Sequence, residues 1–257
     1  MIRAALHQML PPIVVRGIRA VTHLPADWDI RRRTATCVEF HNGARLELRN
    51  EAPDHAVVDQ VFAQRDYDLR AFRQSKALMA KYEQLERPLI LDCGANIGAS
   101  ALWFAHAFPR AKVVAVEPEP GNVALLRRNA RALSNVEVVA AAVAGRPGEL
   151  AIEDPGGGGW AMRTKPGKGI PARTVVDLVD KAGGEPFILK IDIEGFEADV
   201  FAHPTPALDT FALMIVELHD WMLPGSASSR PFLRWHAGCD RDFIYRGENV
   251  FSFRNDR

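Results

Sequence analysis

Cysteine is scarce in this chain of 257 residues. Its three cysteines, Cys37, Cys93 and Cys239, are odd in number, far apart, and form no Cys-x-x-Cys pair. Disulfide frameworks and structural zinc sites need paired or closely spaced cysteines, so the pattern favours free, mostly buried thiols in a reducing compartment. We therefore expect a cytoplasmic protein without structural zinc.

The chain also lacks an excess of charge of either sign, because 32 basic residues balance 32 acidic ones. Strong binding to nucleic acid or to an anionic membrane depends on a basic surface, which this composition does not supply. We expect a small-molecule partner and no nucleic acid. The composition leaves a homo-oligomer open.

Apolar runs long enough to cross a bilayer are absent as well. The N-terminal run at residues 4–15 is interrupted by His7, Gln8 and the pair Pro11-Pro12, and it lacks a small-residue cleavage site. Such a run is neither a signal peptide nor a membrane span. It is expected to pack on its own domain or on a dimer mate, or else to dock on a partner or a membrane surface.

The most informative segment is a buried strand that leads into a turn rich in glycine. Residues 89–92 form the strand, and the turn Gly94-Ala95-Asn96-Ile97-Gly98 follows it. A second apolar strand, about twenty residues further on, ends at Glu117, where Rossmann-like folds place the carboxylate that accepts hydrogen bonds from the ribose hydroxyls. The two features together predict an α/β fold that binds a nucleotide.

The spacing of the glycines separates the possible cofactors. A dinucleotide needs Gly-x-Gly-x-x-Gly, which lets the pyrophosphate approach the amides of a helix N-terminus. Here Asn96 occupies the middle position and Gly98 comes one residue early, as in the adenosyl-methionine loop of class I methyltransferases. S-adenosylmethionine is therefore the predicted cofactor, and an NAD-dependent oxidoreductase or a catalytically silent nucleotide-binding module are the alternatives. The residues expected to contact the cofactor are Asp92, Gly94, Ala95, Asn96, Gly98, Glu117, Pro118, Ala142 and Asp192.

From residue 88 onward, strands and helices alternate, which predicts a doubly wound, mostly parallel sheet. The fold class is thus α/β, a Rossmann-like class I methyltransferase fold with an antiparallel C-terminal hairpin. The expected strands are 89–92, 113–117, 136–140, 187–192, 212–217, 242–246 and 249–253. The expected helices are about 98–108, 119–132, 172–182 and 195–202.

Residues 1–87 are expected to form an N-terminal cap on a cofactor-binding domain at 88–257. The turn Asn42-Gly43 separates two alternating segments and predicts a hairpin at 36–49. Apolar residues from 57 to 85 have helical spacing and would lie across one end of the sheet. Further on, the run Gly156 to Gly159 and Trp160 predict a mobile segment that is either a lid or a hairpin tip.

Ionisable residues gather where the fourth and fifth strands of the predicted parallel sheet end. Ligands bind beyond the carboxyl ends of such strands, so these side chains are expected to share one cleft with the glycine turn. A lysine within so apolar a strand as 187–192 needs a carboxylate partner, because an unpaired buried ammonium is costly. Each group could instead be structural, as an ion pair or at a helix N-terminus. The candidate catalytic residues are His219, Asp192, Glu194, Glu217 and Lys190.

These groups allow two kinds of chemistry. His219 is the first choice as general base, because an imidazole titrates near neutral pH and Glu217 would orient it, and Asp192 is the alternative. The same cluster could instead hold a divalent cation through Asp192, Glu194 or Glu217, and His219, which would polarise an acceptor hydroxyl. The spacing leaves the choice open.

Five segments, 92–98, 116–120, 190–197, 217–219 and 247–250, carry a resemblance to a known family, and the most distinctive is Lys-Ile-Asp-Ile-Glu-Gly-Phe-Glu at 190–197. Together they resemble the FkbM family of S-adenosylmethionine-dependent methyltransferases, over about residues 50–254. The resemblance implies methylation of a hydroxyl on a small secondary metabolite or a sugar. Many relatives have Ile or Val in place of Cys93, a departure that should not disturb a contact made by the backbone.

Overall fold

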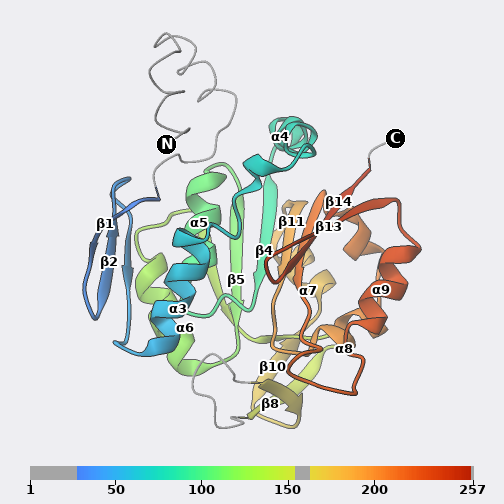
Figure 1. Cartoon of the computed structure of the whole chain (residues 1–257). Coiled ribbons are helices and arrows are strands. Elements are labelled where there is room, and N and C mark those ends of the chain that lie inside the picture. Colours follow the sequence, from blue (N-terminus) through green and yellow to red (C-terminus); the bar gives the residue numbers. More distant parts are fainter. Residues whose placement is uncertain (1–27, 154–162, 256–257) are drawn as a thin grey trace.

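The computed structural model describes residues 28–153 and 163–255, and at its centre lies a seven-stranded sheet (Figure 1). The strand order is β13-β14-β12-β11-β4-β5-β6, and β14 is the strand that runs antiparallel to its neighbours. The strands are β4 (Pro88–Cys93), β5 (Lys112–Glu117), β6 (Val136–Ala140), β11 (Glu185–Ile191), β12 (Leu213–Glu217), β13 (Arg241–Arg246) and β14 (Asn249–Arg254). This topology confirms the predicted doubly wound, Rossmann-like class I methyltransferase fold with its C-terminal hairpin.

Helices cover both faces of the sheet, which is why β4, β5 and β12 consist almost wholly of buried residues. One face packs on α5 (Ala99–Ala107) and α6 (Pro120–Ala130), and its core includes Phe104, Leu125 and Ile215. The other face packs on α7 (Val175–Ala182), α8 (Glu197–Ala202) and α9 (Arg230–Ala237). The helix α9 is not among the predicted helices.

Two predicted helices begin later than the sequence suggests. The helix expected at 172–182 begins at Val175, because a strand occupies the residues before it and a capping box joins Thr174 to Asp177. The helix expected at 195–202 begins at Glu197, because Glu194 and Gly195 have φ of 56° and 94°, outside the helical range. Both corrections concern turns that the apolar spacing does not reveal.

The N-terminal part forms the predicted hairpin, with one strand more than expected. Strands β2 (Cys37–Phe40) and β3 (Arg45–Glu47) pair around the Asn42-Gly43 turn, and β1 (Ile30–Arg33) pairs with β2. The helical segments that follow are α3 (Ala52–Val58), the π-helix η1 (Asp59–Ala63), the 3-10 helix η2 (Leu69–Ala71) and α4 (Ser75–Gln84). In Figure 1, α4 lies across one end of the sheet, as expected, whereas η1, which continues α3, contacts α5.

Side chains from this N-terminal part belong to the same core as the central sheet. Trp28, Phe40 and Phe62 pack with Trp103 of α5, with ring centroids of Trp28 and Trp103 separated by 5.5 Å. The boundary at residue 87 therefore stays a prediction, and the cap is held by a large apolar contact with the rest of the chain.

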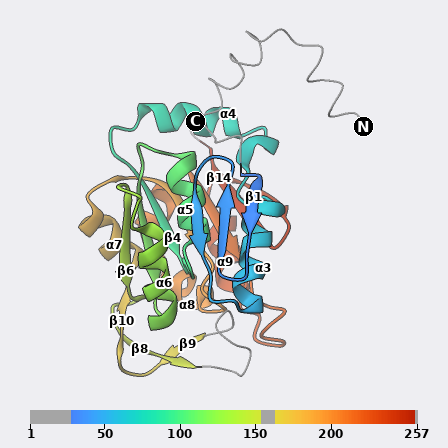
Figure 2. The same ribbon diagram turned by 90° about the vertical axis from the view of Figure 1, so that its left-hand side faces the viewer.

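A second, small sheet lies near one end of the central sheet (Figure 2). Its order is β7-β10-β8-β9, formed by β7 (Ala142–Val143), β8 (Gly148–Glu153), β9 (Arg163–Pro166) and β10 (Ile170–Arg173). The sequence suggested a mobile segment here and no sheet. Gly156 to Gly159 and Trp160, like residues 4–15, lie outside the described residues. No helix in the described ranges is long and apolar enough to cross a membrane.

Candidate active site

The turn at residues 94–98, called the cofactor turn because cofactor binding is predicted there, follows β4, and Gly94 is required by a close approach to the end of β11. Gly94 has φ of +80°, and a Cβ there would lie 1.7 Å from the carbonyl oxygen of Asp192. Gly98 has φ of +95° and abuts Leu126 of α6. No larger residue fits at Gly94 without moving the backbone, so the turn lies directly against the end of β11.

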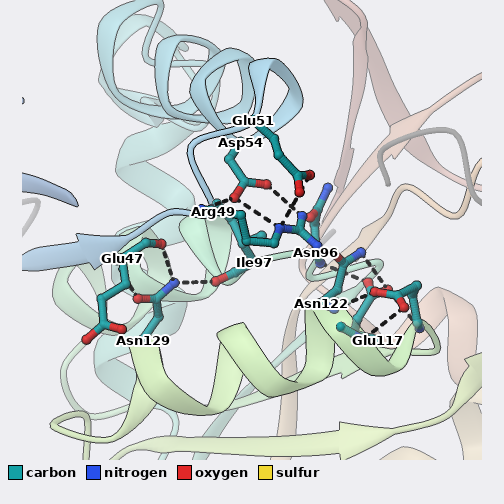
Figure 3. A network of polar contacts seen from close by, with 11 residues as sticks. Glu47, Arg49, Glu51, Asp54, Asn96, Ile97, Glu117, Asn122 and Asn129 are labelled. Atoms are coloured by element: carbon teal, nitrogen blue, oxygen red, sulfur yellow. Dashed lines mark hydrogen bonds and ion pairs between the residues drawn. The ribbon is translucent and has the colours of Figure 1, made fainter. Parts of the chain in front are cut away.

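Glu117 lies at the end of β5, beside this turn, and is nearly fully buried (Figure 3). Its carboxylate accepts hydrogen bonds from the backbone N–H of Asn96 at 2.9 Å and of Glu119 at 3.0 Å, and from Nδ2 of Asn122 at 3.2 Å. Burial raises the pKa of this carboxyl, and the three hydrogen bonds oppose that rise. The acid is therefore fixed where the sequence places the ribose partner.

A second asparagine of α6 connects the cofactor turn to the N-terminal sheet. Asn129 accepts a hydrogen bond from the N–H of Glu47 at 2.7 Å and donates to the carbonyls of Glu47 at 3.2 Å and Ile97 at 2.8 Å. Figure 3 shows this amide between β3 and the turn. Because Asn129 is buried, these bonds hold the turn and β3 in a fixed relation.

The start of α3 is held by a partly buried ion pair. Arg49 donates to both carboxylate oxygens of Asp54, at 3.1 and 2.6 Å, and Glu51 lies 3.8 Å from the same guanidinium (Figure 3). Asp54 is 1% exposed and also accepts the backbone N–H of Arg49. This bidentate contact fixes the position of α3 against the chain that precedes it.

Lys190 has the carboxylate partners that its buried position requires. Its Nζ lies 3.3 Å from Asp92 and 3.3 Å from Asp192, and it donates to the carbonyl of Gly94 at 2.8 Å. Asp92 also accepts a hydrogen bond from Ser100 at 2.6 Å. Lys190 and Asp92 therefore join the cofactor turn to the end of β11 from inside the protein, away from the cavity described below.

Four carboxylates surround His219, which is only 2% exposed. Its Nδ1 lies 3.1 Å from Oε1 of Glu197, which is itself buried and accepts the backbone N–H of Ile193. Its Nε2 lies 3.5 Å from Glu217 and 3.7 Å from each of Asp192 and Glu194. Glu197 thus lies close to one side of the imidazole, and the other side faces three acids.

Crowding changes the proton affinity of these groups. Burial lowers the pKa of His219, but hydrogen bonds with Glu197 and Glu217 and nearby negative charge outweigh it and raise the pKa to about 11. Burial and the charge of Asp192 raise the pKa of Glu194 to about 8 and that of Glu217 to about 7. The unliganded cluster therefore contains a charged imidazole among acids that repel one another.

A cavity of about 550 Å³ opens onto this cluster. Five of the predicted site residues line it, namely Asn96, Asp192, Glu194, Glu217 and His219. The rest of the lining comes from α3, η1 and three loops, which supply Ala52, Pro53, Ala56, Val57, Gln60, Gln64, Asp66, Trp221, Gly247 and Glu248. The turn residue Asn96 and the ionisable cluster therefore share one cleft, as expected.

Other predicted cofactor contacts lie outside this cavity. Asp92 is buried beneath the turn, and Ala142 is buried in β7, where it pairs with Ala172 of β10. Pro118 is partly exposed at the end of β5. Their contacts with a cofactor stay predictions.

Sequence reasoning missed Glu197 as a partner of His219, although it closes the distinctive 190–197 motif. The helix α3, from the part of the chain predicted to form the N-terminal cap, contributes to the cavity wall. Among the described residues, one group of three side chains could hold a metal ion, with ligand atoms that all lie within 4.8 Å of one another. Its members are Asp192, Glu194 and His219. Glu194 rather than Glu217 therefore completes this group.

The fold, the cofactor turn and the acid at the end of β5 define a class I methyltransferase. The chain belongs to the Methyltransferase FkbM domain family, which matches residues 92–241. This finding confirms the resemblance seen in the sequence.

Individual relatives are distant. The chain is 25% identical over 175 residues to "2-O-methyltransferase NoeI" of Sinorhizobium fredii, covering 59% of this chain and 70% of that protein. It is 28% identical over 152 residues to "Release factor glutamine methyltransferase" of Moorella thermoacetica, covering 59% of this chain but only 45% of that protein. A solved methyltransferase from Geobacter sulfurreducens is 20% identical, with a TM-score of 0.41 and coverage of 81% of this chain and 93% of that one.

Proposed function

We propose that this protein transfers a methyl group from S-adenosylmethionine to a hydroxyl of a small molecule, either a secondary metabolite or a sugar. The observation that carries the proposal is the single cavity that joins Asn96 of the cofactor turn to Asp192, Glu194, Glu217 and His219. A donor held along the turn would therefore present its methyl group beside groups that can accept a proton.

The cofactor assignment is supported by the family and by two local features. The turn from Gly94 to Gly98 has the spacing of an adenosyl-methionine loop, and Glu117 is held beside it by three hydrogen bonds. One carboxylate oxygen can accept more than one hydrogen bond, so Glu117 keeps acceptor capacity for ribose hydroxyls. An NAD cofactor would need a further glycine for its pyrophosphate.

Methyl transfer from a sulfonium is an in-line displacement, so the acceptor oxygen must lie about 3 Å from the methyl carbon on the side opposite sulfur. The hydroxyl must also lose its proton. Four acids around His219 favour the charged imidazole, which has no lone pair to offer. We therefore infer that Glu217 accepts the proton of the hydroxyl, in place of the His219 base expected from the sequence. Glu217 lines the cavity 3.5 Å from His219.

The first test is calorimetric titration of the folded protein with S-adenosylhomocysteine. Binding with one site per chain is expected, and its absence would remove the basis for the cofactor assignment. A parallel fluorescence titration with NADH tests the oxidoreductase alternative, for which NADH and not S-adenosylhomocysteine would bind.

The second test separates an enzyme from a silent binding module. Pools of sugars and secondary metabolites are incubated with donor carrying an isotopically labelled methyl group, and mass spectrometry follows the gain of one labelled methyl. With an acceptor in hand, Glu217→Gln should lower the rate by about a hundredfold or more while donor binding persists. An unchanged rate would refute Glu217 as the proton acceptor.

A further inference from the structure

Three side chains at the floor of the cavity point their ligand atoms at one another. Asp192 follows β11, Glu194 lies in the turn after it, and His219 follows β12, so adjacent parallel strands deliver all three to the same edge. Their ligand atoms lie within 4.8 Å of one another. Two carboxylates and one imidazole form a donor set that divalent first-row cations such as Mn²⁺ accept.

The distances within this group are too long for good hydrogen bonds. Nε2 of His219 lies 3.7 Å from Oδ1 of Asp192 and 3.7 Å from Oε2 of Glu194, whereas an N–H···O bond spans about 2.7–3.2 Å. Atoms that bind one cation at about 2.1 Å stand roughly 3–4 Å from one another, which is the spacing found here.

Each of these three side chains keeps one atom directed at the other two, although Nε2 of His219 also lies 3.5 Å from Glu217. Oε1 of Glu197 lies 3.1 Å from Nδ1 of His219, so a carboxylate stands beside the ring nitrogen that faces away from the group, as is usual for a metal-binding histidine, and Nε2 faces the group. To bind an ion, Nε2 gives up its proton, and the cation takes the place of that positive charge among the acids. Oδ2 of Asp192 is the oxygen that faces Lys190, at 3.3 Å, so Oδ1 remains for the cluster. The imidazole is only 2% exposed and its Nε2 faces the two acids, which is an observation independent of the acids themselves.

We propose that Asp192, Glu194 and His219 bind one divalent cation, either Mn²⁺ or Mg²⁺, in the cavity described above. All three residues line that cavity, so further coordination positions face the space that an acceptor would enter. An acceptor hydroxyl can then coordinate the ion through its oxygen, which lowers the pKa of the hydroxyl.

The catalytic use of this ion rests on the function proposed above, although binding of the ion does not. The O–H bond of the coordinated hydroxyl breaks, and its proton goes to Glu217, which lies outside the group of three. The oxygen then forms a bond to the methyl carbon as the bond between sulfur and that carbon breaks, giving a methyl ether and S-adenosylhomocysteine. The charge of the ion does not change.

The test measures the ion alone, without donor or acceptor. Tag-free protein is treated with a chelator and dialysed, and Mn²⁺ is titrated while electron paramagnetic resonance follows the signal of free Mn²⁺. One bound ion per chain is expected. Asp192→Asn and Glu194→Gln should each weaken binding by about tenfold or more, and Glu197→Gln should weaken it through the orientation of His219.

The matched control is Glu248→Gln, which removes a carboxylate that lines the same cavity but is not one of the three proposed ligands, and which should leave Mn²⁺ affinity unchanged. Circular dichroism and S-adenosylhomocysteine titration show that each variant is folded and whether the donor site is intact. Lack of Mn²⁺ binding at millimolar concentration, or equal weakening by Glu248→Gln, would overturn the metal site even if S-adenosylhomocysteine binds. Failure of S-adenosylhomocysteine alone to bind would instead count against the proposed function.

Discussion

Replacing Lys190 by methionine should destabilise the protein far more than the loss of an ordinary surface lysine. The ammonium is buried and balances two carboxylates, Asp92 and Asp192, each 3.3 Å away, while donating to Gly94. Asp92 is fully buried, so without the lysine its charge has no water to solvate it. Removing one partner of a buried pair costs about 3–5 kcal/mol, and we expect a loss in that range.

Lys112→Met is the matched control. Lys112 also lies on the central sheet and pairs with Glu137 at 2.8 Å, but both side chains are 40% exposed. Exposed pairs contribute about 0–1 kcal/mol, because water solvates each charge when its partner is removed. The two lysine variants thus separate the effect of burial from the loss of a charge on the sheet.

The assay is urea denaturation followed by circular dichroism, with the free energy of unfolding compared among the wild type, Lys190→Met and Lys112→Met. For a chain of this size, the expected loss corresponds to a fall in melting temperature of roughly 6–20 °C. The double variant Lys190→Met/Asp92→Asn should recover part of the loss, because it removes the uncompensated charge. Equal losses in the two single variants would refute the reasoning.

Three further predictions concern the cofactor turn and the core. Gly94→Ala should abolish binding of S-adenosylhomocysteine, because the new Cβ would lie 1.7 Å from the carbonyl of Asp192. The control Gly43→Ala, at a similar positive φ but with nothing within 4 Å, should cost only about 1–2 kcal/mol in stability and leave binding intact. Equal effects of the two variants on binding would contradict this. Asn129→Ala should cost about 1–3 kcal/mol and weaken S-adenosylhomocysteine binding, because it removes the partner of three backbone groups in β3 and the cofactor turn; full calorimetric affinity would argue against this coupling. Burial, and to a lesser extent neighbouring negative charge, raises the pKa of the Cys93 thiol, so a colorimetric thiol reagent should modify it only after unfolding in urea; reaction at the rate of the other two cysteines would show that β4 opens readily.

The strands of the central sheet were predictable because parallel strands covered on both faces are continuous apolar runs. The buried lysine of β11 was equally informative, since the cost of an unpaired ammonium required an acid nearby, and the structure supplies Asp92 and Asp192. These inferences depend on local sequence and on general energetics, which do not require knowledge of the loops.

The remainder depends on loop geometry that the sequence does not display. Glu197 reaches His219 because Glu194 and Gly195 turn the chain with positive φ before α8. The small sheet interrupts its apolar pattern with glycine and proline, so its strands resemble a loop. The wall formed by α3 comes from a segment more than 130 residues before the acids that line the same cavity, a pairing set by tertiary packing rather than by periodicity.

The hydrogen bonds of Asn129 reach β3 through the peptide groups of Glu47 and reach the cofactor turn through the carbonyl of Ile97. Hydrogen bonds to main-chain atoms do not depend on which side chains these residues carry. The side chains of the segment that leads into α3 can thus change in evolution and reshape the cavity for a new acceptor. The cofactor turn keeps its position relative to β3 as long as the side-chain amide of Asn129 is retained.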